Sequence, residues 1–258
     1  MRALVERPGS WQADWAQLAQ GLLRVQSEAG ERQLIDELSR PARPVSLAFA
    51  NAHAMNSVAT SRAFFEALRS ADLVLRDGSG MALLFRLLRM QPGRNLNGTD
   101  LIPKIIRRHA GGRIALFGTQ QPYLGRARKV VMGTLAPGST CFTANGFLDS
   151  RDYVRLARAD QPDLIVLGMG MPRQEEVARE LRSALDHPCL IICGGAIIDF
   201  MGGKTPRAPR WIRALDLEWA YRLSREPRRL FRRYVLGNPL FVARAVRLAA
   251  RARPLSLS

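Results

Sequence analysis

The sequence predicts an α/β protein with a Rossmann-like parallel sheet covered by helices on both faces, followed by a basic helical appendage at the C-terminus. Three observations lead to this prediction. Short β-rich apolar runs alternate with amphipathic segments of helical length from residue 45 onward. Glycine-containing loops follow nearly every apolar run, as in sheets that bind ligands at their strand ends. Basic residues are concentrated in residues 203–258, which hold 14 Lys and Arg against 3 Asp and Glu.

The charge distribution divides the 258-residue chain into two parts. Residues 1–202 carry 25 basic and 19 acidic residues, which is ordinary for a soluble body, and we expect them to form the α/β domain. Its first part, residues 1–43, is expected to be a helical extension. Residues 203–258 account for most of the net charge of +17 and are expected to form the helical appendage.

Periodicity predicts the elements of the α/β domain in order. Residues 11–26 are expected to form one amphipathic helix, and residues 41–44 a linker into the first strand. Strands are expected at 45–50, 72–75, 113–117, 140–143, 163–167 and 190–193. Helices are expected at 58–69, 80–88, 100–109, 122–134, 151–158 and 172–185. Thr99 and Ser150 are suited to cap helix N-termini, while Pro122 and Pro172 suit a first helical position.

The appendage is expected to contain three helices, at 209–223, 227–236 and 239–251, with Gly237 and Asn238 separating the last two. The third has two distinct faces. Basic residues on one face are Arg244, Arg247 and Arg251, and apolar residues on another are Phe241, Ala245, Leu248 and Ala249. This pattern is typical of a helix that lies in a membrane interface. We therefore expect the appendage to contact an anionic membrane surface.

Several classes of protein are disfavoured by the composition. The three cysteines, Cys141, Cys189 and Cys193, lie in apolar stretches, which favours buried free thiols in a reducing compartment. We find no apolar run of signal-peptide length at the N-terminus, and no uncharged stretch of the roughly 18 residues that a membrane span needs. We therefore expect a cytoplasmic protein that touches a membrane only peripherally.

The motifs of dinucleotide binding and ATP hydrolysis are incomplete. Arg173 stands where the third glycine of a dinucleotide motif belongs, and Ile198 where the upstream glycine of a P-loop belongs. The three histidines share no metal-ligand spacing, although His53, in a loop after a strand, could contact a ligand.

Glycines after the strands are candidates for binding a nucleotide-type ligand. Ligands of an open parallel sheet bind beyond the carboxyl ends of its strands, where glycine amides can approach phosphate closely. The candidates are Gly78, Gly118, Gly146, Gly168 and Gly170.

Asp77 is the strongest candidate for an acid or base, because it directly follows an apolar strand and precedes a glycine. From the residues alone, two interpretations stay open: a catalytic carboxylate, or a cap of the following helix.

Ordered motifs carry a resemblance to a known family. They are Asn51-Ala-His, Ala71-Asp-Leu-Val-Leu-Arg-Asp-Gly78, Gly98-Thr-Asp100, Gly168-Met-Gly-Met-Pro-Arg-Gln-Glu175, Gly194-Gly-Ala-Ile-Ile-Asp-Phe200 and Arg207-Ala-Pro-Arg-Trp211. In order and spacing they resemble the WecG/TagA/CpsF family of bacterial glycosyltransferases, over about residues 45 to 241. The resemblance implies an inverting transferase at the inner face of the cell membrane. It would move a hexose or N-acetylhexosamine from a UDP-sugar to a saccharide on undecaprenyl diphosphate, in cell-surface or exopolysaccharide biosynthesis.

Individual roles follow from the resemblance by position. It implies that Asp77 is the general base, that Asn51 lies beside it, and that Gln174 and Asp199 line the UDP pocket. It also implies that arginines of the docked appendage reach the diphosphate of the acceptor, namely Arg222, Arg229 and Arg232. No carboxylate cluster resembling a metal site accompanies these residues, so we expect metal-independent transfer without a cofactor.

The chain departs from the family at one position. The family usually has an arginine three residues before the Gly-Thr-Asp motif, whereas this chain has Asn95 there and Arg94 one residue earlier. Either Arg94 substitutes through a small loop shift, or this enzyme handles its donor or acceptor differently.

Two other functions stay open. The pI of about 11.3 and the mixture of arginine with aromatic residues would suit a nucleic-acid-binding protein, but the amphipathic alternation favours lipid, and we expect no nucleic-acid partner. A non-catalytic scaffold of the same fold is permitted by the departure at Asn95. The donor stays open among UDP-N-acetylmannosamine, its uronic acid and UDP-glucose, and a homo-oligomer is possible.

Overall fold

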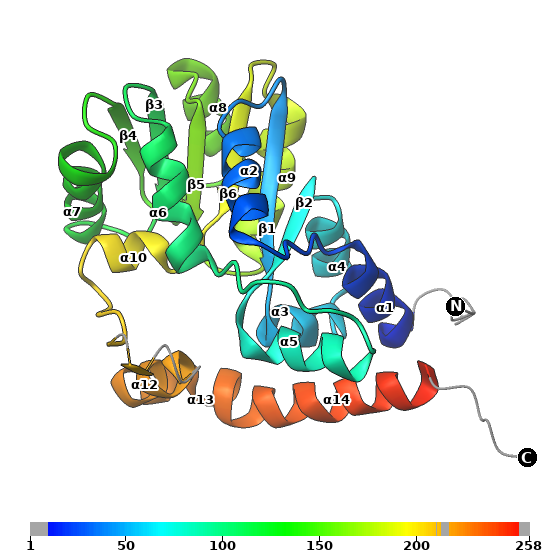
Figure 1. Ribbon diagram of the computed structural model, residues 1–258. Helices are drawn as coiled ribbons and strands as arrows, with labels where there is room; N and C mark the ends of the chain where they lie inside the picture. Colours follow the sequence, from blue (N-terminus) through cyan, green and yellow to red (C-terminus); the bar gives the residue numbers. More distant parts are fainter. Residues whose placement is uncertain (1–9, 210, 213–216, 253–258) are drawn as a thin grey trace, which may run out of the picture.

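The structure is a computed structural model that describes residues 10–209, 211–212 and 217–252. Its six parallel strands form one sheet in the order β2-β1-β6-β5-β3-β4, which confirms the predicted fold class (Figure 1). The strands are β1 (Pro44–Ala50), β2 (Leu73–Arg76), β3 (Arg113–Gly118), β4 (Thr140–Ala144), β5 (Leu164–Gly168) and β6 (Cys189–Cys193). Every strand begins and ends within one residue of its predicted bounds.

Helices cover both faces of the sheet, and α1 and α2 precede its first strand in the chain. They are α1 (Trp11–Gly21), α2 (Glu28–Leu38), α3 (Ala52–Val58), α4 (Arg62–Arg69), α5 (Gly78–Leu87), α6 (Gly98–Arg108), α7 (Tyr123–Val130), the π-helix η1 (Val131–Leu135), α8 (Ser150–Asp160), α9 (Arg173–Ala184) and α10 (Ile197–Met201).

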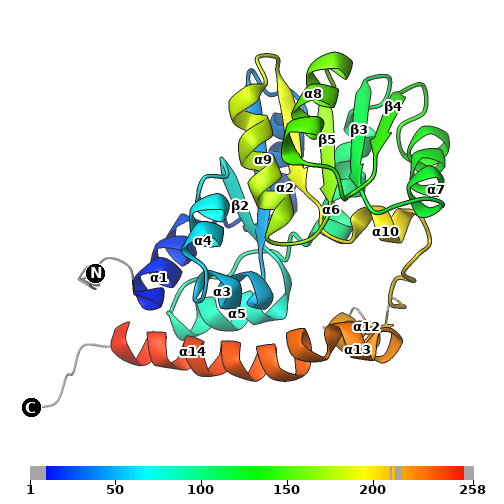
Figure 2. The same cartoon turned by 180° about the vertical axis from the view of Figure 1, so that it is seen from behind.

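The two faces of the sheet have separate hydrophobic cores, because successive strand residues point to opposite sides. In β1, Ala48 and Ala50 belong to one core with α8 and α9, whereas Leu47 and Phe49 belong to the other with α2 and α6. Helices α2 and α6 lie in front of the sheet in Figure 1, and α8 and α9 lie in front of it in Figure 2. Since both faces are covered, the strands are mostly apolar runs, which made them recognisable in the sequence.

The N-terminal extension differs from its prediction. Residues 11–26 do not form one helix, because α1 ends at Gly21 and Leu23 then makes an isolated parallel bridge to Leu75. A second helix, α2, follows Ser27, whose side chain accepts a hydrogen bond from the Gly30 backbone N–H. A serine cap thus starts a new helix where the apolar pattern alone predicted continuation.

Capping also corrects other helix bounds. The segment predicted as one helix at 58–69 contains the end of α3 and all of α4, because Ser61 caps α4 by accepting from the Phe64 N–H. The predicted caps are wrong too: the N-cap residues of α6 and α8 are Asn97 and Asp149 rather than Thr99 and Ser150. Pro122 and Pro172 stand at the N-cap position of α7 and α9, one residue earlier than expected.

Asp72 ties the start of β1 to the sheet edge. Its carboxylate accepts hydrogen bonds from the backbone and hydroxyl of Ser46 at 2.8 and 2.9 Å. It also pairs with Arg43 at 2.8 Å and Arg182 at 2.9 Å. Burial acts to raise the pKa of Asp72, but these hydrogen bonds and the charge of Arg182 hold the pKa below its usual value. The residue is therefore structural.

We expect Asp72→Asn to lower the free energy of unfolding by about 2 kcal/mol at pH 7, because it removes the charge from several charge-assisted hydrogen bonds. A pKa lowered by folding gives stability that is present above the pKa of the unfolded chain, about 3.9, and is lost as the pH falls through the folded pKa. Denaturant titrations from pH 7 to pH 3 should therefore show the two proteins converging below about pH 4. A difference that persists unchanged at pH 3 would contradict this account.

The appendage forms a band of helices across the end of the sheet at which α3 and α5 begin (Figure 1). These helices are α12 (Glu218–Arg225), α13 (Pro227–Phe231), the π-helix η2 (Arg232–Leu236) and α14 (Gly237–Ala252). Gly237 has helical angles, φ −71° and ψ −37°, so η2 runs directly into α14 and the predicted break at Gly237 and Asn238 is wrong. The helix predicted at 209–223 lies partly outside the described residues, and α12 covers its end.

The apolar face of α14 packs on the protein body, so its interpretation as a membrane-facing surface is wrong. Phe241, Ala245 and Leu248 are buried there, in the same core as residues of α1, α3 and α5. The ring of Phe241 lies 5.4 Å from that of Trp15 in α1, measured between centroids. In the described parts of the chain, we find no helix that is both long and apolar enough to cross a membrane.

Candidate active site

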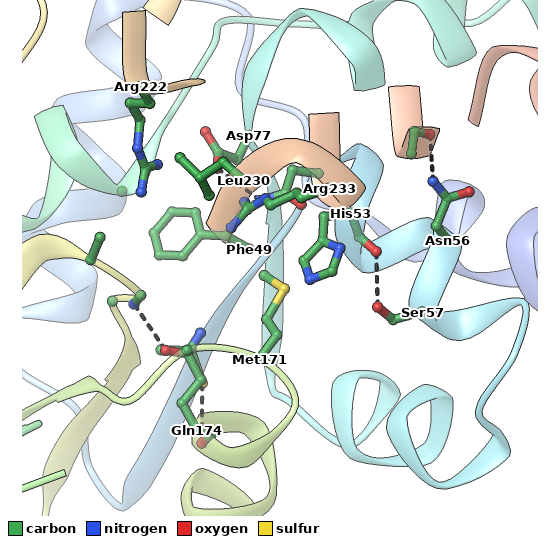
Figure 3. Close-up of a pocket in the computed structure, with 18 of the residues that line it drawn as sticks. Phe49, His53, Asn56, Ser57, Asp77, Met171, Gln174, Arg222, Leu230 and Arg233 are labelled. Carbon is green, nitrogen blue, oxygen red and sulfur yellow. Dashed lines mark hydrogen bonds between the residues drawn. The ribbon is translucent and has the colours of Figure 1, made fainter. Parts of the chain in front are cut away.

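Two cavities meet beneath the appendage. The first, of about 720 Å³, opens beyond the carboxyl ends of β1, β5 and β6 and is covered by α12, α13 and η2 (Figure 3). The second, of about 680 Å³, lies between α5 and the helices α12 and α14. Residues that line both cavities are Asn51, His53, Asp77, Thr99, Arg222 and Arg233. Asp77 therefore lies in the wall between two spaces, each large enough for a small ligand.

The position of Asp77 is fixed by its neighbours. Arg76, which is buried, donates to the backbone oxygens of Gly78, Pro92 and Gly93, and so ties the turn after β2 to the loop before α6. Gly78 has φ +83°, a left-handed conformation that glycine adopts without strain. Its N–H donates to Asn95 Oδ1 at 2.9 Å.

The capping interpretation of Asp77 fails. The residue stands at the N-cap position of α5, but its side chain makes no capping hydrogen bond. Instead its Oδ2 accepts from Asn51 Nδ2 at 3.2 Å. Asn51 in turn caps α3, since its Oδ1 accepts from the Ala54 N–H at 3.0 Å. The sequence prediction that these two residues lie together is thus met by the geometry.

Burial is the largest influence on the carboxyl of Asp77 and raises its pKa above the usual value. The hydrogen bond from Asn51 and the nearby charges of Arg233, Arg222 and Arg76 act in the opposite direction without cancelling the effect. A carboxylate with a raised pKa is a stronger base than an exposed one.

His53 lies at the start of α3 and faces the same space. Burial, together with the charge of Arg233, lowers its pKa to about 4. The imidazole is therefore neutral near pH 7 and offers one donor and one acceptor nitrogen. Figure 3 shows Arg233 reaching from η2 toward the space between Asp77 and His53.

The loops after β5 and β6 form the floor of the first cavity. Gly168 and Gly170 line it, together with Gly194 and Gly195. Gln174, which is buried, connects the two loops: its Oε1 accepts from the Gly195 N–H at 2.9 Å and its Nε2 donates to Glu175 Oε1 at 2.8 Å. Burial raises the pKa of Glu175 to about 7.

Asp199, at the start of α10, also lines the first cavity. Its carboxylate accepts from the Thr119 hydroxyl and lies 3.3 Å from Lys204 Nζ. The loop after β3 and the segment after β6 are thereby joined at one corner of the cavity.

Two candidate glycines serve packing instead of lining either cavity. A Cβ atom on Gly118 would lie 2.5 Å from the backbone oxygen of Gly168, and one on Gly146 would lie 2.9 Å from the backbone nitrogen of Thr119. The sequence signal for a ligand loop and for close backbone packing is the same, a glycine after a strand. Gly78 lines only the second cavity.

Arginines of the appendage crowd the mouth of the first cavity. Arg222, Arg229 and Arg232, which the resemblance assigns to the acceptor diphosphate, all line it. Arg229 pairs with Glu226, and the guanidinium of Arg222 lies over the Phe200 ring at 5.4 Å. Sequence reasoning missed Arg233, whose buried Nε finds no hydrogen-bond partner among the described residues. Its only signal was its place in the arginine run of the appendage.

Metal ligands are not gathered at this site: in the ranges that the structure describes, no three His, Cys, Asp or Glu side chains come together in a group that could bind a metal ion. The cysteines Cys141, Cys189 and Cys193 are buried free thiols.

Comparison with known proteins gives a consistent result. The model of the glycosyl transferase WecG/TagA/CpsF family matches residues 22–254. An N-acetylglucosaminyldiphosphoundecaprenol N-acetyl-beta-D-mannosaminyltransferase from Bacillus subtilis (strain 168) is 27% identical over 170 residues, 64% of this chain and 66% of the relative, just under two thirds of its length. A protein of the same name from Staphylococcus aureus (strain MRSA252) is 26% identical over 211 residues, 79% of this chain and 82% of the relative.

Proposed function

Because the chain belongs to the WecG/TagA/CpsF family of glycosyltransferases, we propose that it transfers a hexose or N-acetylhexosamine from a UDP-sugar to a saccharide carried on undecaprenyl diphosphate. The observation that carries the proposal is Asp77, a carboxylate oriented by Asn51 in the wall between two cavities. The names of the relatives describe transfer of N-acetylmannosamine to an N-acetylglucosaminyl diphosphoundecaprenol. N-acetylmannosamine is therefore the first donor sugar to test.

The donor is proposed to occupy the first cavity. Its diphosphate would lie against the loops of Gly168, Gly170 and Gly195, whose backbone amides can approach phosphate closely. Gln174 and Asp199 would hold these loops in place rather than contact the donor with their own side chains. The side chain of Gln174 already accepts a hydrogen bond from the Gly195 N–H, and that of Asp199 accepts one from the Thr119 hydroxyl. The cavity volume of about 720 Å³ is in the range of small-molecule sites.

In the proposed reaction, an acceptor hydroxyl attacks the anomeric carbon of the donor while Asp77 takes its proton. A new glycosidic bond forms as the bond between the anomeric carbon and the β-phosphate oxygen breaks, and UDP leaves with the electron pair. Attack opposite the leaving group inverts the anomeric configuration. The neutral His53 could bind a sugar hydroxyl without adding charge beside Asp77.

The appendage arginines are proposed to bind the diphosphate of the acceptor. Arg222, Arg229 and Arg232 line the same cavity mouth, and guanidinium groups bind phosphate oxygens by charge-assisted hydrogen bonds. We propose that these cations, together with Arg233, replace a divalent metal in neutralising phosphate charge. Turnover that survives excess EDTA would support this part of the proposal, and its loss with recovery on adding Mg²⁺ would contradict it.

We propose that the protein acts peripherally on the inner face of the cell membrane. The buried face of α14 does not serve this purpose, but the exposed apolar side chains of Leu236, Leu240 and Val246 lie on the same helices as exposed arginines such as Arg247. Apolar side chains beside basic ones suit an anionic lipid surface.

The rival functions make different predictions. Family membership gives no support to the nucleic-acid-binding alternative. Liposome flotation and a nucleic-acid shift assay at the same salt concentration separate the two functions: tight nucleic-acid binding without binding to anionic liposomes would favour this alternative. A scaffold without catalysis would release no UDP when acceptor is added.

The direct test mixes the full chain with UDP-N-acetylmannosamine, its uronic acid or UDP-glucose, and with a synthetic lipid diphosphate carrying N-acetylglucosamine. We expect acceptor-dependent UDP release and an acceptor heavier by one sugar for one of these donors. Absence of both signals for every UDP-sugar, with a folded protein in anionic vesicles, would overturn the proposed function.

A further inference from the structure

The second cavity has the side chains of a sugar-binding site. One wall is aromatic and apolar, formed by Trp219, Tyr234 and Val242 of the appendage opposite Leu83 of α5. The rings of Trp219 and Tyr234 lie 6.1 Å apart between centroids, and Trp219 is 38% exposed. Aromatic faces of this kind pack against the C–H faces of a pyranose ring, while polar groups at the rim bind its hydroxyls.

Polar groups complete the other wall. Asn95, Asn97 and Thr99 line the cavity beside the start of α5, and Ser79 of α5 lines it too. Asn95 uses its Oδ1 to accept from the Gly78 N–H, while its Nδ2 has no acceptor among the residues that the structure describes. An amide donor next to an aromatic wall is suited to a sugar hydroxyl or acetamido oxygen.

The position of this cavity relative to Asp77 matches the geometry of glycosyl transfer. A base that deprotonates an acceptor must lie within hydrogen-bond reach of the acceptor hydroxyl, while the oxygen of that hydroxyl faces the anomeric carbon of the donor. Asp77 borders both cavities, and the glycine loops proposed to bind the donor line only the first. A sugar in the second cavity could therefore place a hydroxyl where the two cavities adjoin, beside Asp77 and facing a donor held by the glycine loops.

The departure from the family pattern falls in this cavity. Arg94 does not substitute for the missing arginine, because its Nε pairs with Glu31 at 3.1 Å and it lines neither cavity. At this position the cavity is lined by the short, neutral amide of Asn95. The charged side chains that line the cavity are of both signs: Arg222 and Arg233 are basic, and Asp77, Glu218 and Asp100 are acidic, the last paired with Arg207. This balance favours an uncharged sugar.

We propose that the second cavity binds the terminal, uncharged pyranose of the acceptor, with Trp219 packing on the ring and Asn95 contacting a polar substituent. The inference deepens the proposed function, on which it rests, by assigning the acceptor sugar to a site separate from the donor.

The test uses two substitutions on opposite walls. Leu83→Trp fills the cavity from α5 and changes no residue of the appendage. Trp219→Leu removes the aromatic face of the appendage wall, and Trp219→Phe is its conservative variant. The probes are UDP for the donor site and a short-chain alkyl diphosphate carrying N-acetylglucosamine for the acceptor site. Trp211→Ala is the matched control, because Trp211 is 65% exposed in the same appendage and lines neither cavity.

We expect Leu83→Trp and Trp219→Leu to raise the acceptor KM by about 10- to 100-fold while the Kd for UDP, measured by calorimetry, changes less than about threefold. Trp219→Phe should recover most of the loss, and Trp211→Ala should behave like the wild type. An acceptor KM that is unchanged in both variants, or a Kd for UDP that rises with Leu83→Trp, would overturn the inference.

Direct binding separates this inference from the proposed function. The protein is titrated with the acceptor probe in the presence of UDP, and calorimetry measures the binding. This measurement does not depend on turnover. If the wild type binds the probe and Leu83→Trp does not, the site is supported even should no sugar be transferred. If wild type and Leu83→Trp bind it equally, or neither binds it, the site is refuted, whatever the transfer assay shows.

Discussion

Replacement of Asp77 by asparagine is expected to reduce sugar transfer by about 10²- to 10⁴-fold, because the amide cannot accept the proton of the attacking hydroxyl. The substitution preserves the shape of the side chain, and Asn51 remains as its neighbour. The Kd for UDP should therefore stay within a few-fold of the wild type. Initial rates of UDP release at saturating donor and acceptor measure the loss.

Two further observations decide the role of Asp77. In the wild type, the raised pKa means that transfer should fall with acidification at a pH above the 3.8 of an ordinary aspartate, since only the ionised form is a base. Asp149→Asn is the matched control, because Asp149 is exposed at the start of α8 and lines neither cavity. Transfer by Asp77→Asn at the wild-type rate would remove Asp77 as the base.

Trp15→Ala is expected to lower the free energy of unfolding by about 3–5 kcal/mol, the cost of deleting a large buried aromatic side chain. Trp15 is fully buried, its Nε1 donates to the Met55 backbone oxygen at 2.7 Å, and its ring packs on Phe241 of α14. Loss of this support should loosen α14 and with it the arginines over the cavities. Transfer should therefore fall although Trp15 lines neither cavity.

Chemical denaturation measures the first effect, and hydrogen exchange of the α14 amides together with transfer rates measures the second. Tyr153→Ala provides the comparison, because Tyr153 is equally buried in the same core but belongs to α8 and packs on Phe117. We expect it to destabilise the protein without faster exchange in α14 or loss of transfer below the melting temperature. Equal loss of transfer in both variants would show that Trp15 acts only through overall stability.

The candidate active-site end of the fold could be predicted because its signals are local. The strands are mostly apolar runs, and Asn51, Asp77 and the glycines of the β5 loop follow directly after such strands. Parallel strands bring these loops to one edge of the sheet, so their order in the sequence was enough to place them together. The hydrogen bond between Asn51 and Asp77 is the clearest outcome of that rule.

The glycines show where the same rule stops. Gly168 lines the first cavity and Gly118 does not, although both end strands that pair with each other. Gly118 is required because the backbone of Gly168 lies against it. A glycine needed for a ligand and one needed for a neighbouring chain have the same local sequence, so only the packing of the two strands distinguishes them.

By itself, the sequence determined the parallel sheet, the order of its strands along the chain, the family, and the loops that carry Asp77 and Gln174. Those features depend on periodicity and on turn chemistry over a few residues. The tertiary structure decided which way the apolar face of α14 points, and it points at Trp15, 226 residues away from Phe241, rather than at a membrane. An amphipathic helix has the same pattern in either setting, because burial of its apolar face lowers the free energy whether lipid or protein covers it, and only the folded chain shows which one does.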